Sequence, residues 1–230
     1  MSYLLRVLLP DRPGMLGAVA SALGHAGADI LSVDVVERSA GVAVDDLIVE
    51  LPAGKLADAL ITAAVSVPGV SVESIQHYYA RVGEAHEELE LLEALATSPE
   101  RSADLLVAGA PQIFRAGWAV VVRYDERGPL VEAASAAAPD LGELDLPWLP
   151  LARAQVLDPT ARWVPADWGI LGTELAAAPL GDPDRAVVVG RPGGPAWRPA
   201  EILRLAHLAG IAVTVAQQTA PPAPAHRSRR

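Results

Sequence analysis

Apolar and polar positions follow two different periods within the first 80 residues. The run Tyr3–Leu9 is short and mainly apolar, which predicts a β-strand. The apolar residues that follow recur at the i, i+3, i+4, i+7 spacing of one buried helix face: Leu16, Val19, Ala20 and Leu23. Gly27 stands where a glycine is expected to end that helix. The chain is therefore predicted to begin with a strand and an amphipathic helix.

Segments with a strand pattern and segments with a helix pattern continue to residue 78. Two β-rich runs, 28–37 and 42–51, are separated by the polar segment 38–41, a pattern typical of a hairpin. A second helical repeat follows, with one apolar face: Leu56, Ala59, Leu60 and Ala63. It ends at Pro68-Gly69, and residues 70–78 predict a last strand. The order β-α-β-β-α-β is the split arrangement of ferredoxin-like folds.

The segment Asp11–Leu16 joins the first strand to the first helix. Pro13 suits the first turn of a helix, because its missing N–H would have no partner there. Gly14 allows the backbone to approach a bound group closely, and the free amides of a helix start favour anions. Asp11 stands where a capping carboxylate would meet those amides. The segment predicts either a binding loop or a capped helix start without a ligand.

Two motifs in this region resemble those of ACT domains, the small regulatory modules that bind amino acids. Residues 11–16, Asp-Arg-Pro-Gly-Met-Leu, resemble the D-R-P-G-Φ-L turn of that family, where Φ is apolar. Gly27–Ile30 resembles its G-x-N/D-I junction between the first helix and the second strand. Both motifs lie at the right separation within the right element order. The resemblance implies a ferredoxin-like βαββαβ module over residues 1–82.

The resemblance also implies where a ligand binds. ACT modules pair side by side into an eight-stranded sheet, and their ligands lie at the seam, between the first loop of one copy and the helix–strand junction of its mate. The loop here supplies Asp11, Arg12, Pro13, Gly14, Met15 and Leu16, and the junction supplies Ala28, Asp29 and Ile30. The helix-start amides suit the carboxylate of an amino acid, and Asp11 and Asp29 suit its ammonium. Serine-sensing relatives carry asparagines at these two places, which puts serine specificity in doubt.

At 230 residues, the chain leaves about 150 for a second domain. Residues 84–96 predict an acidic helix, and Ser98 and Pro99 predict the cap and first position of the next helix. Two strand pairs and a closing helix are predicted after it: 117–136, 173–190 and 199–217. The segment 137–172 is rich in proline, aspartate and alanine, and it predicts only a short strand near 155–157.

Residues 187–205 resemble the end of a GAF domain, in which a strand leads through a loop into a final helix. The sequence there reads Val-Val-Val-Gly-Arg, then a glycine- and proline-rich loop, then Trp-Arg-Pro-Ala-Glu and a long helix. The resemblance implies an antiparallel sheet with flanking helices over residues 84–218, serving as a small-molecule sensor or a dimerisation module. The tail 219–230 is rich in proline and arginine and is expected to be disordered.

Composition excludes several classes of partner. The formal net charge of −10 argues against a nucleic-acid partner, since such proteins are usually basic. No apolar run reaches the roughly 18 residues of a membrane span, so no membrane partner is expected. The N-terminus lacks a signal-peptide pattern, and the absence of cysteine rules out disulfides and cysteine-based metal sites. These features fit a cytoplasmic location.

No catalytic residues, metal site or cofactor are predicted. The five histidines are isolated, without a second histidine or a carboxylate at metal-ligand spacing. Residues 190–194 lack the G-x-G-x-x-G spacing of a dinucleotide loop, so a turn is predicted there. Asp45 and Asp46 are adjacent on a strand and face opposite sides, so they cannot act as an acid–base pair. They are expected to cap an edge or face solvent.

These observations predict a non-enzymatic, amino-acid-binding regulatory protein with its ligand at the ACT dimer seam. A homodimer is expected, because an exposed strand edge is otherwise a liability. One alternative is a ligand-free dimerisation or interaction module, in which both domains only assemble with an unidentified protein partner. The other is an enzyme whose catalytic groups lie within 137–172. The sequence does not name the amino acid.

Overall fold

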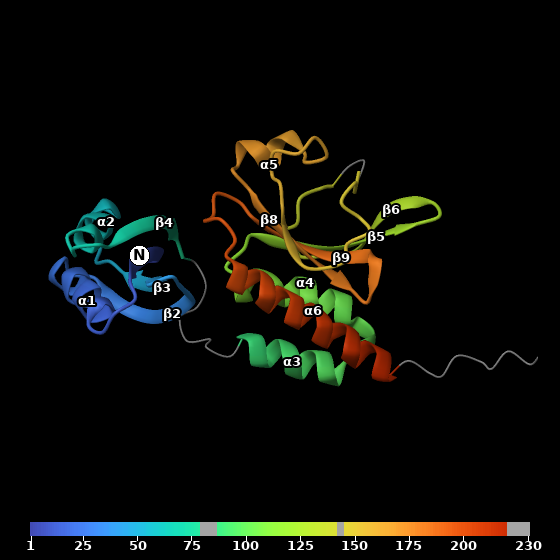
Figure 1. Ribbon diagram of the computed structural model, residues 1–230, viewed down its shortest axis with the longest axis horizontal. Helices are drawn as coiled ribbons and strands as arrows, with labels where there is room; N and C mark the ends of the chain where they lie inside the picture. The colour runs from blue at the N-terminus through green and yellow to red at the C-terminus, as the bar shows by residue number, and fades with distance from the viewer. Residues whose placement is uncertain (79–86, 142–144, 220–230) are drawn as a thin grey trace, which may run out of the picture. The chain divides into compact units, whose positions relative to one another are not determined.

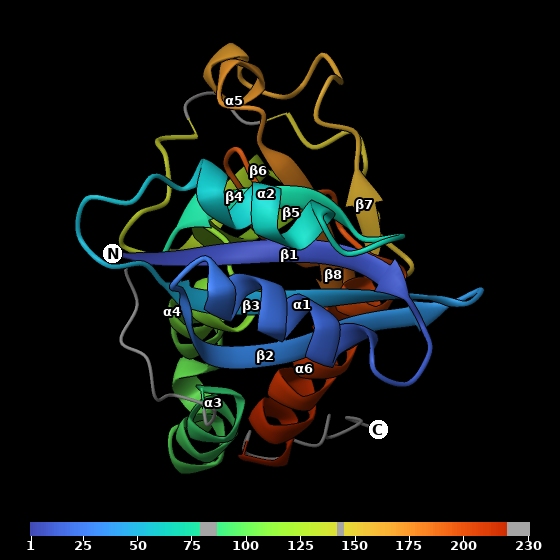
Figure 2. The same cartoon turned by 90° about the vertical axis from the view of Figure 1, so that its left-hand side faces the viewer.

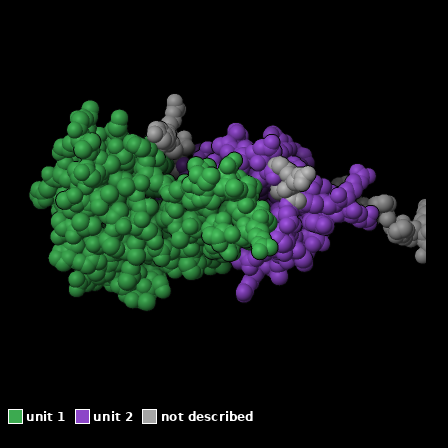
Figure 3. Space-filling view, turned by 90° about the horizontal axis from the view of Figure 1, so that it is seen from above, with its two compact units in different colours: residues 1–85, 156–176, 190–204 green, residues 86–155, 177–189, 205–230 purple. Residues whose placement is uncertain are grey.

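The structure is a computed structural model that describes residues 1–78, 87–141 and 145–219. The chain divides into two compact units (Figure 3). The first unit comprises residues 1–85, 156–176 and 190–204, and the second comprises residues 86–155, 177–189 and 205–230. The predicted domain boundary between 82 and 84 and the predicted disorder of residues 220–230 lie outside the described residues. Thr219, predicted as the first tail residue, instead ends a helix.

The N-terminal region forms a four-stranded antiparallel sheet with the order β2-β3-β1-β4. Its elements follow the predicted βαββαβ order: β1 Ser2–Pro10, α1 Met15–His25, β2 Asp29–Ser39, β3 Val42–Glu50, α2 Asp58–Val65 and β4 Ser71–His77. Both helices cover the same face of the sheet (Figure 2). Strand β2 is one edge of the sheet, so one side of its backbone pairs with β3 and the other is open.

The core of this region lies between the sheet and its two helices. Side chains alternate between the faces of a strand, so every second residue of β1 and β3 points toward the helices. The inward residues are Leu5, Val7 and Leu9 of β1 and Ala43, Leu47 and Val49 of β3, packed with Val19 and Leu23 of α1 and Leu60 and Ala64 of α2. Asp45 stands between Ala43 and Leu47 and therefore lies on the helix-covered face. The apolar alternation of β3 thus contains one carboxylate on its inner side.

The two adjacent aspartates of β3 correct one sequence prediction. They lie on opposite faces, as predicted, but Asp45 is only 2% exposed and Asp46 only 1% exposed. The expectation that they cap an edge or face solvent was therefore wrong. Burial of Asp46 is possible because the Arg6 guanidinium donates to it from the neighbouring strand, with Nε–Oδ1 at 2.7 Å and Nη2–Oδ2 at 2.9 Å.

The start of α1 differs from the prediction by two residues. The helix begins at Met15, and its N-cap is Gly14 with φ of 90°, so Pro13 lies before the helix and not in its first turn. This left-handed backbone is the reason that glycine suits position 14. No side chain caps the helix, because the Asp11 carboxylate accepts hydrogen bonds from Arg38 instead. Gly27 does end the helix as predicted, with φ of 81° directly after the C-cap.

The rest of the described chain carries a five-stranded antiparallel sheet with the order β6-β5-β9-β8-β7. Its strands are β5 Trp118–Asp125, β6 Gly128–Ala134, β7 Gln155–Leu157, β8 Glu174–Leu180 and β9 Asp182–Arg191. The helices are α3 Glu87–Thr97, the 3₁₀ turn η1 Pro99–Arg101, α4 Ser102–Ile113, α5 Ala166–Ile170 and α6 Pro199–Thr219. Helices α3, α4 and α6 lie on the same side of this sheet (Figures 1 and 2).

The predicted elements of this region are confirmed. The hairpin, the late strand pair and the short strand at 155–157 are all present, and Ser98 is the N-cap before Pro99. Residues 190–194 form the end of β9 and a turn. Helix α5 was not predicted, because its five residues are too few for a helical repeat to show. The fold is α+β throughout.

Helix α6 bears on the expected absence of a membrane partner. By length and apolar content alone, Pro199–Gln218 is the one helix within the described residues that could cross a membrane. A helix packed into a protein core meets the same criteria, and Leu205, Leu208, Ala209 and Ala212 of α6 are buried. Charged residues interrupt its apolar run, so the sequence pattern did not indicate a span there. The absence of a membrane partner therefore stays a prediction.

Candidate functional site

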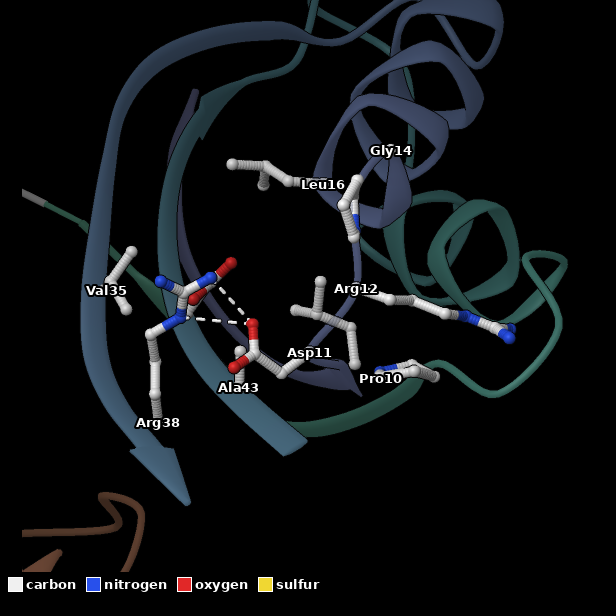
Figure 4. Close-up of a pocket in the computed structure, with 11 residues that line it drawn as sticks. Pro10, Asp11, Arg12, Gly14, Leu16, Val35, Arg38 and Ala43 are labelled. Atoms are coloured by element: carbon white, nitrogen blue, oxygen red, sulfur yellow. Dashed lines mark hydrogen bonds and ion pairs between the residues drawn. The ribbon is translucent and has the colours of Figure 1, made fainter. Parts of the chain in front are cut away.

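A pocket of about 410 Å³ opens beside the loop that joins β1 to α1 (Figure 4). It lies where the ACT resemblance placed half of a ligand site. Strands β1, β2 and β3 contribute to it together with the loop and the first turn of α1. The lining residues are Leu9, Pro10, Asp11, Arg12, Pro13, Gly14, Leu16, Val35, Arg38, Ala43 and Asp45.

An ion pair fixes the loop at one side of the pocket. Arg38, near the end of β2, donates from Nε and Nη2 to the same oxygen of Asp11, Oδ1, at 3.1 and 2.6 Å (Figure 4). The Asp11 amide also donates to the Gly41 carbonyl at 2.8 Å, which ties the loop to the β2–β3 turn. The Arg38 side chain is 66% exposed, so the pair contributes little to stability and can rearrange around a ligand.

The inner wall of the pocket carries the buried carboxylate of Asp45. Its Oδ1 has no hydrogen-bond partner within the part of the chain that the structure describes. Burial raises the pKa of Asp45 above its ordinary value, and the carboxylates of Asp46 and Asp11 add to this, whereas Arg38 opposes it. A buried carboxylate oxygen without a hydrogen-bond partner is costly, so this site favours the arrival of a cation or a proton.

The start of α1 gives the pocket a side that suits anions, and its apolar lining residues suit methylene groups. Gly14 and Leu16 belong to the start of α1, where the first-turn amides lack acceptors within the helix and the helix dipole is positive. Arg12 extends its guanidinium away from Asp11 (Figure 4). The apolar wall consists of Leu9, Leu16, Val35 and Ala43. The pocket can therefore bind a molecule that carries both charges and an apolar stem.

The described residues place the loop half of the predicted site in the pocket. Asp11, Arg12, Pro13, Gly14 and Leu16 line it, whereas Met15 packs against the core. No group of three or more histidines, aspartates and glutamates that could hold a metal ion occurs in the part of the chain that is described. The first strand, the loop and the helix together position this pocket.

The junction half of the predicted site lies elsewhere in the same copy. Asp29 pairs with Glu50 at one end of β3, whereas Asp11 is bonded to Gly41, just before the other end. The three junction residues, Ala28, Asp29 and Ile30, do not line the pocket. Within one copy the full length of β3 separates Asp29 from the loop, so the arrangement in which the loop of one copy meets the junction of its mate stays a prediction.

Sequence reasoning missed six lining residues: Leu9, Pro10, Val35, Arg38, Ala43 and Asp45. The signal for Asp45 was present, since it interrupts the apolar alternation Ala43, Leu47, Val49 on the inner side of β3. Arg38 could be placed only once the hairpin register was known, because that register sets the β2–β3 turn against the loop.

A second group of buried charges lies in the first compact unit, on the other face of β3. Arg6 donates to Asp46, as described, and also to Glu201 Oε1 at 3.0 Å. Arg191 donates to the same Glu201 oxygen at 2.8 Å, and its guanidinium lies 3.9 Å from the centre of the Trp197 ring. Two guanidiniums and two carboxylates thus balance one another in a buried network.

Glu201 connects this network to the start of α6. It is the third residue of that helix and accepts a hydrogen bond from the Arg198 amide at 2.8 Å, which is half of a capping box. Burial acts to raise the pKa of Glu201, but Arg191 and Arg6 outweigh it, and the pKa is lowered. The network therefore pairs its buried carboxylates with guanidiniums.

Residues 3–69 match the family model of the ACT domain. The curated relatives with similar segments are the cell division protein FtsA of Agrobacterium fabrum and that of Rhizobium radiobacter, each 43% identical over 58 residues. That segment is 25% of this chain and 13% of FtsA, so the match spans a small part of those proteins.

Two solved structures are also similar. A formyltetrahydrofolate deformylase from Pseudomonas putida is 15% identical, with a TM-score of 0.29 over 42% of this chain and 38% of that one. The chromophore-binding domain of an unusual bacteriophytochrome from R. palustris is 9% identical, with a TM-score of 0.40 over 95% of both chains. Similarity at this level does not assign a function, and the GAF-like assignment of residues 84–218 stays a prediction.

Proposed function

Proceeding from the ACT domain at residues 3–69, we propose that this chain is a non-enzymatic regulatory protein that binds an amino acid beside the β1–α1 loop. The observation that carries the proposal is the charge pattern of the pocket. The first-turn amides of α1 suit a carboxylate, and Asp11 and Asp45 suit an ammonium. A free amino acid carries these two groups on one carbon atom. A cytoplasmic location belongs to the same proposal.

The open edge of β2 supports a homodimer as the working form. This 11-residue strand exposes Val33 and Val35, which are 41% and 54% exposed. Antiparallel pairing along the full strand with β2 of a second copy places Asp29 of that copy opposite Ser39, next to Arg38. The two halves of the predicted site, the loop and the junction, then meet across the seam, which one copy alone does not achieve.

Thermal unfolding of the full chain in the presence of each common amino acid tests this proposal. A ligand at about 100 times its Kd adds about 2.7 kcal/mol to the free energy of unfolding. We expect one chemical class of amino acid to raise the Tm and the others to leave it unchanged. If none raises it, amino-acid sensing is refuted.

The same open edge favours a second candidate, a dimerisation module without a ligand. Light scattering separates the two when it is combined with the unfolding series. A dimer that no amino acid stabilises supports assembly alone, and a monomer at micromolar concentration with and without amino acids contradicts both.

A further inference from the structure

We propose that the ligand of this pocket is an amino acid with a cationic side chain, whose terminal cation binds Asp45. The inference rests on the proposed function and names the class of amino acid. It starts from a buried carboxylate that lines the pocket and has an oxygen without a partner among the described residues. A neutral zwitterion that places its ammonium on Asp11 and its carboxylate at the helix start leaves that oxygen unpaired.

Arg38 offsets part of the charge of Asp45 but donates no hydrogen bond to it among the described residues. Arg38 lines the pocket from the neighbouring strand, but both of its hydrogen bonds go to Asp11. Asp11 itself is negative, and Asp46, on the far face of the same strand, is engaged by Arg6. Of the other charged residues that line the pocket, Asp11 and Arg38 are paired with each other and Arg12 extends its guanidinium away from Asp11, so Oδ1 of Asp45 is left for a cation of the ligand.

The apolar wall explains why the cation should stand at the end of a chain of methylene groups. Leu9, Leu16, Val35 and Ala43 line the pocket together with Asp45. Long cationic side chains bury their methylene stems along such surfaces and keep the charged end on a polar partner. Arg38 contacts only Oδ1 of Asp11, so Oδ2 is left for the α-ammonium, and the helix-start amides receive the α-carboxylate.

Calorimetric titration of the full chain with L-lysine and L-norleucine tests the inference. Norleucine has the same carbon chain as lysine and lacks only the terminal amine. Loss of one charged hydrogen bond costs about 1.5–3 kcal/mol, which corresponds to about 10–150-fold in Kd. We therefore expect lysine to bind about 10–150-fold more tightly than norleucine, with L-arginine and L-ornithine in the same class as lysine.

Asp45→Asn is the matching variant, since it keeps the size of the side chain and removes its charge. It should weaken lysine binding about 10–150-fold and leave the Kd of norleucine unchanged. The control is Asp58→Asn at the exposed start of α2, which removes the same charge outside the pocket lining. This control should bind both amino acids as the unmodified protein does.

A titration of the unmodified protein against pH provides a second readout that needs no variant. Protonation of Asp45 competes with the ligand cation, and its pKa is raised by burial, Asp46 and Asp11 and lowered by Arg38. Lysine affinity should fall as the pH falls through that raised pKa, while norleucine affinity should not.

The outcomes separate this inference from the proposed function. Equal binding of norleucine and lysine, or a lysine preference that survives in Asp45→Asn, overturns the role of Asp45 and leaves the amino-acid pocket standing. If no amino acid of any charge binds the unmodified protein, the proposed function fails and the inference fails with it.

Discussion

Asp45 sets the charge of the pocket, and its environment explains why a single residue has this effect. The side chain lies on the helix-covered face of β3, in a row that is otherwise apolar. In such surroundings an ionised carboxylate has lost its hydrating water. The free energy of the carboxylate then depends on whether an opposite charge takes the place of that water. In the unliganded protein, Arg38 offsets part of the charge of Asp45, and Oδ1 of Asp45 has no hydrogen-bond partner within the described residues.

The stability of the unliganded protein should therefore depend on the protonation of Asp45. Its folded pKa is raised above the unfolded value, so the folded state binds more protons between the two values. The stability that Asp45 contributes is full below the unfolded pKa and is lost as the pH rises through the folded pKa. Chemical unfolding of unmodified protein and Asp45→Asn across that range should show this loss only in the unmodified protein. An identical pH dependence in both proteins contradicts it.

The sequence placed Asp45 and Asp46 on opposite faces because alternation along a strand is a local property. It did not predict their burial, because burial comes from partners that are distant in sequence. Asp45 lies in a pocket lined by residues 9–14 and 16, and Asp46 is paired with Arg6. The apolar neighbours of Asp45 on β3 indicate the face on which it lies, but the flanking residues identify neither of these contacts.

At the scale of elements, the β1–α1 turn and the β2 edge position the site. The sequence predicted every element of the βαββαβ module, because each has a complete hydrophobic period of its own. The helix start was the exception, since the cap depends on the left-handed backbone of Gly14 and on an ion pair between Asp11 and Arg38, 27 residues apart. The helix–strand junction was assigned to the site by resemblance, and one copy of the chain does not bring it to the pocket.

Gly14→Ala should weaken the start of α1 for a conformational reason alone. An added Cβ meets nothing within 4 Å, but φ of +90° is strained for any residue with a side chain. We expect a loss of about 1–2 kcal/mol in the free energy of unfolding. Gly17→Ala is the control, because it lies inside α1, is equally open and should gain about 0.5–1 kcal/mol. Equal effects of the two substitutions in urea unfolding rule out the conformational explanation.

Val33→Lys should disrupt a dimer that pairs through β2. A lysine on an edge strand opposes the addition of another strand, and Val33 is exposed on that edge. We expect the light-scattering mass to fall from dimer to monomer at micromolar concentration. Val131→Lys on β6, the edge of the second sheet with a similarly exposed valine, should leave the mass unchanged. A dimer that survives Val33→Lys places the interface elsewhere.

At the scale of the whole molecule, the buried charges join segments that are far apart in the chain. Arg6 reaches both Asp46 and Glu201, which lie 40 and 195 residues away. All belong to the first compact unit, which shows why this unit includes residues 190–204 as well as the N-terminal sheet. No periodicity could predict such pairs, because each partner looks like an ordinary charged residue within its own segment.

Glu201→Gln should therefore be strongly destabilising. It removes the charge of the carboxylate to which both Arg191 and Arg6 donate, and breaking a buried ion pair typically costs about 3–5 kcal/mol. Glu132→Gln, which breaks the more exposed pair with Arg185, is the control and should cost no more than about 1 kcal/mol. Similar losses for both variants in urea unfolding contradict this account of the network.

The network should also affect how the free energy of unfolding changes at low pH. The pKa of Glu201 is lowered in the folded state, so the stability that it contributes is present above its unfolded pKa and is lost as the pH falls through the folded value. Acid unfolding of the unmodified protein should show this loss, and Glu201→Gln should lack it.

The central claim is that an amino acid binds at the β1–α1 loop, and hydrogen–deuterium exchange tests it most directly. The full chain is compared with and without the amino acid that raises its Tm most. We predict slower exchange in peptides that cover residues 11–16 and 38–45, where the pocket lies, and unchanged exchange over residues 177–189 in the second compact unit. Protection confined to the second unit, or no protection anywhere with saturating amino acid, contradicts the account.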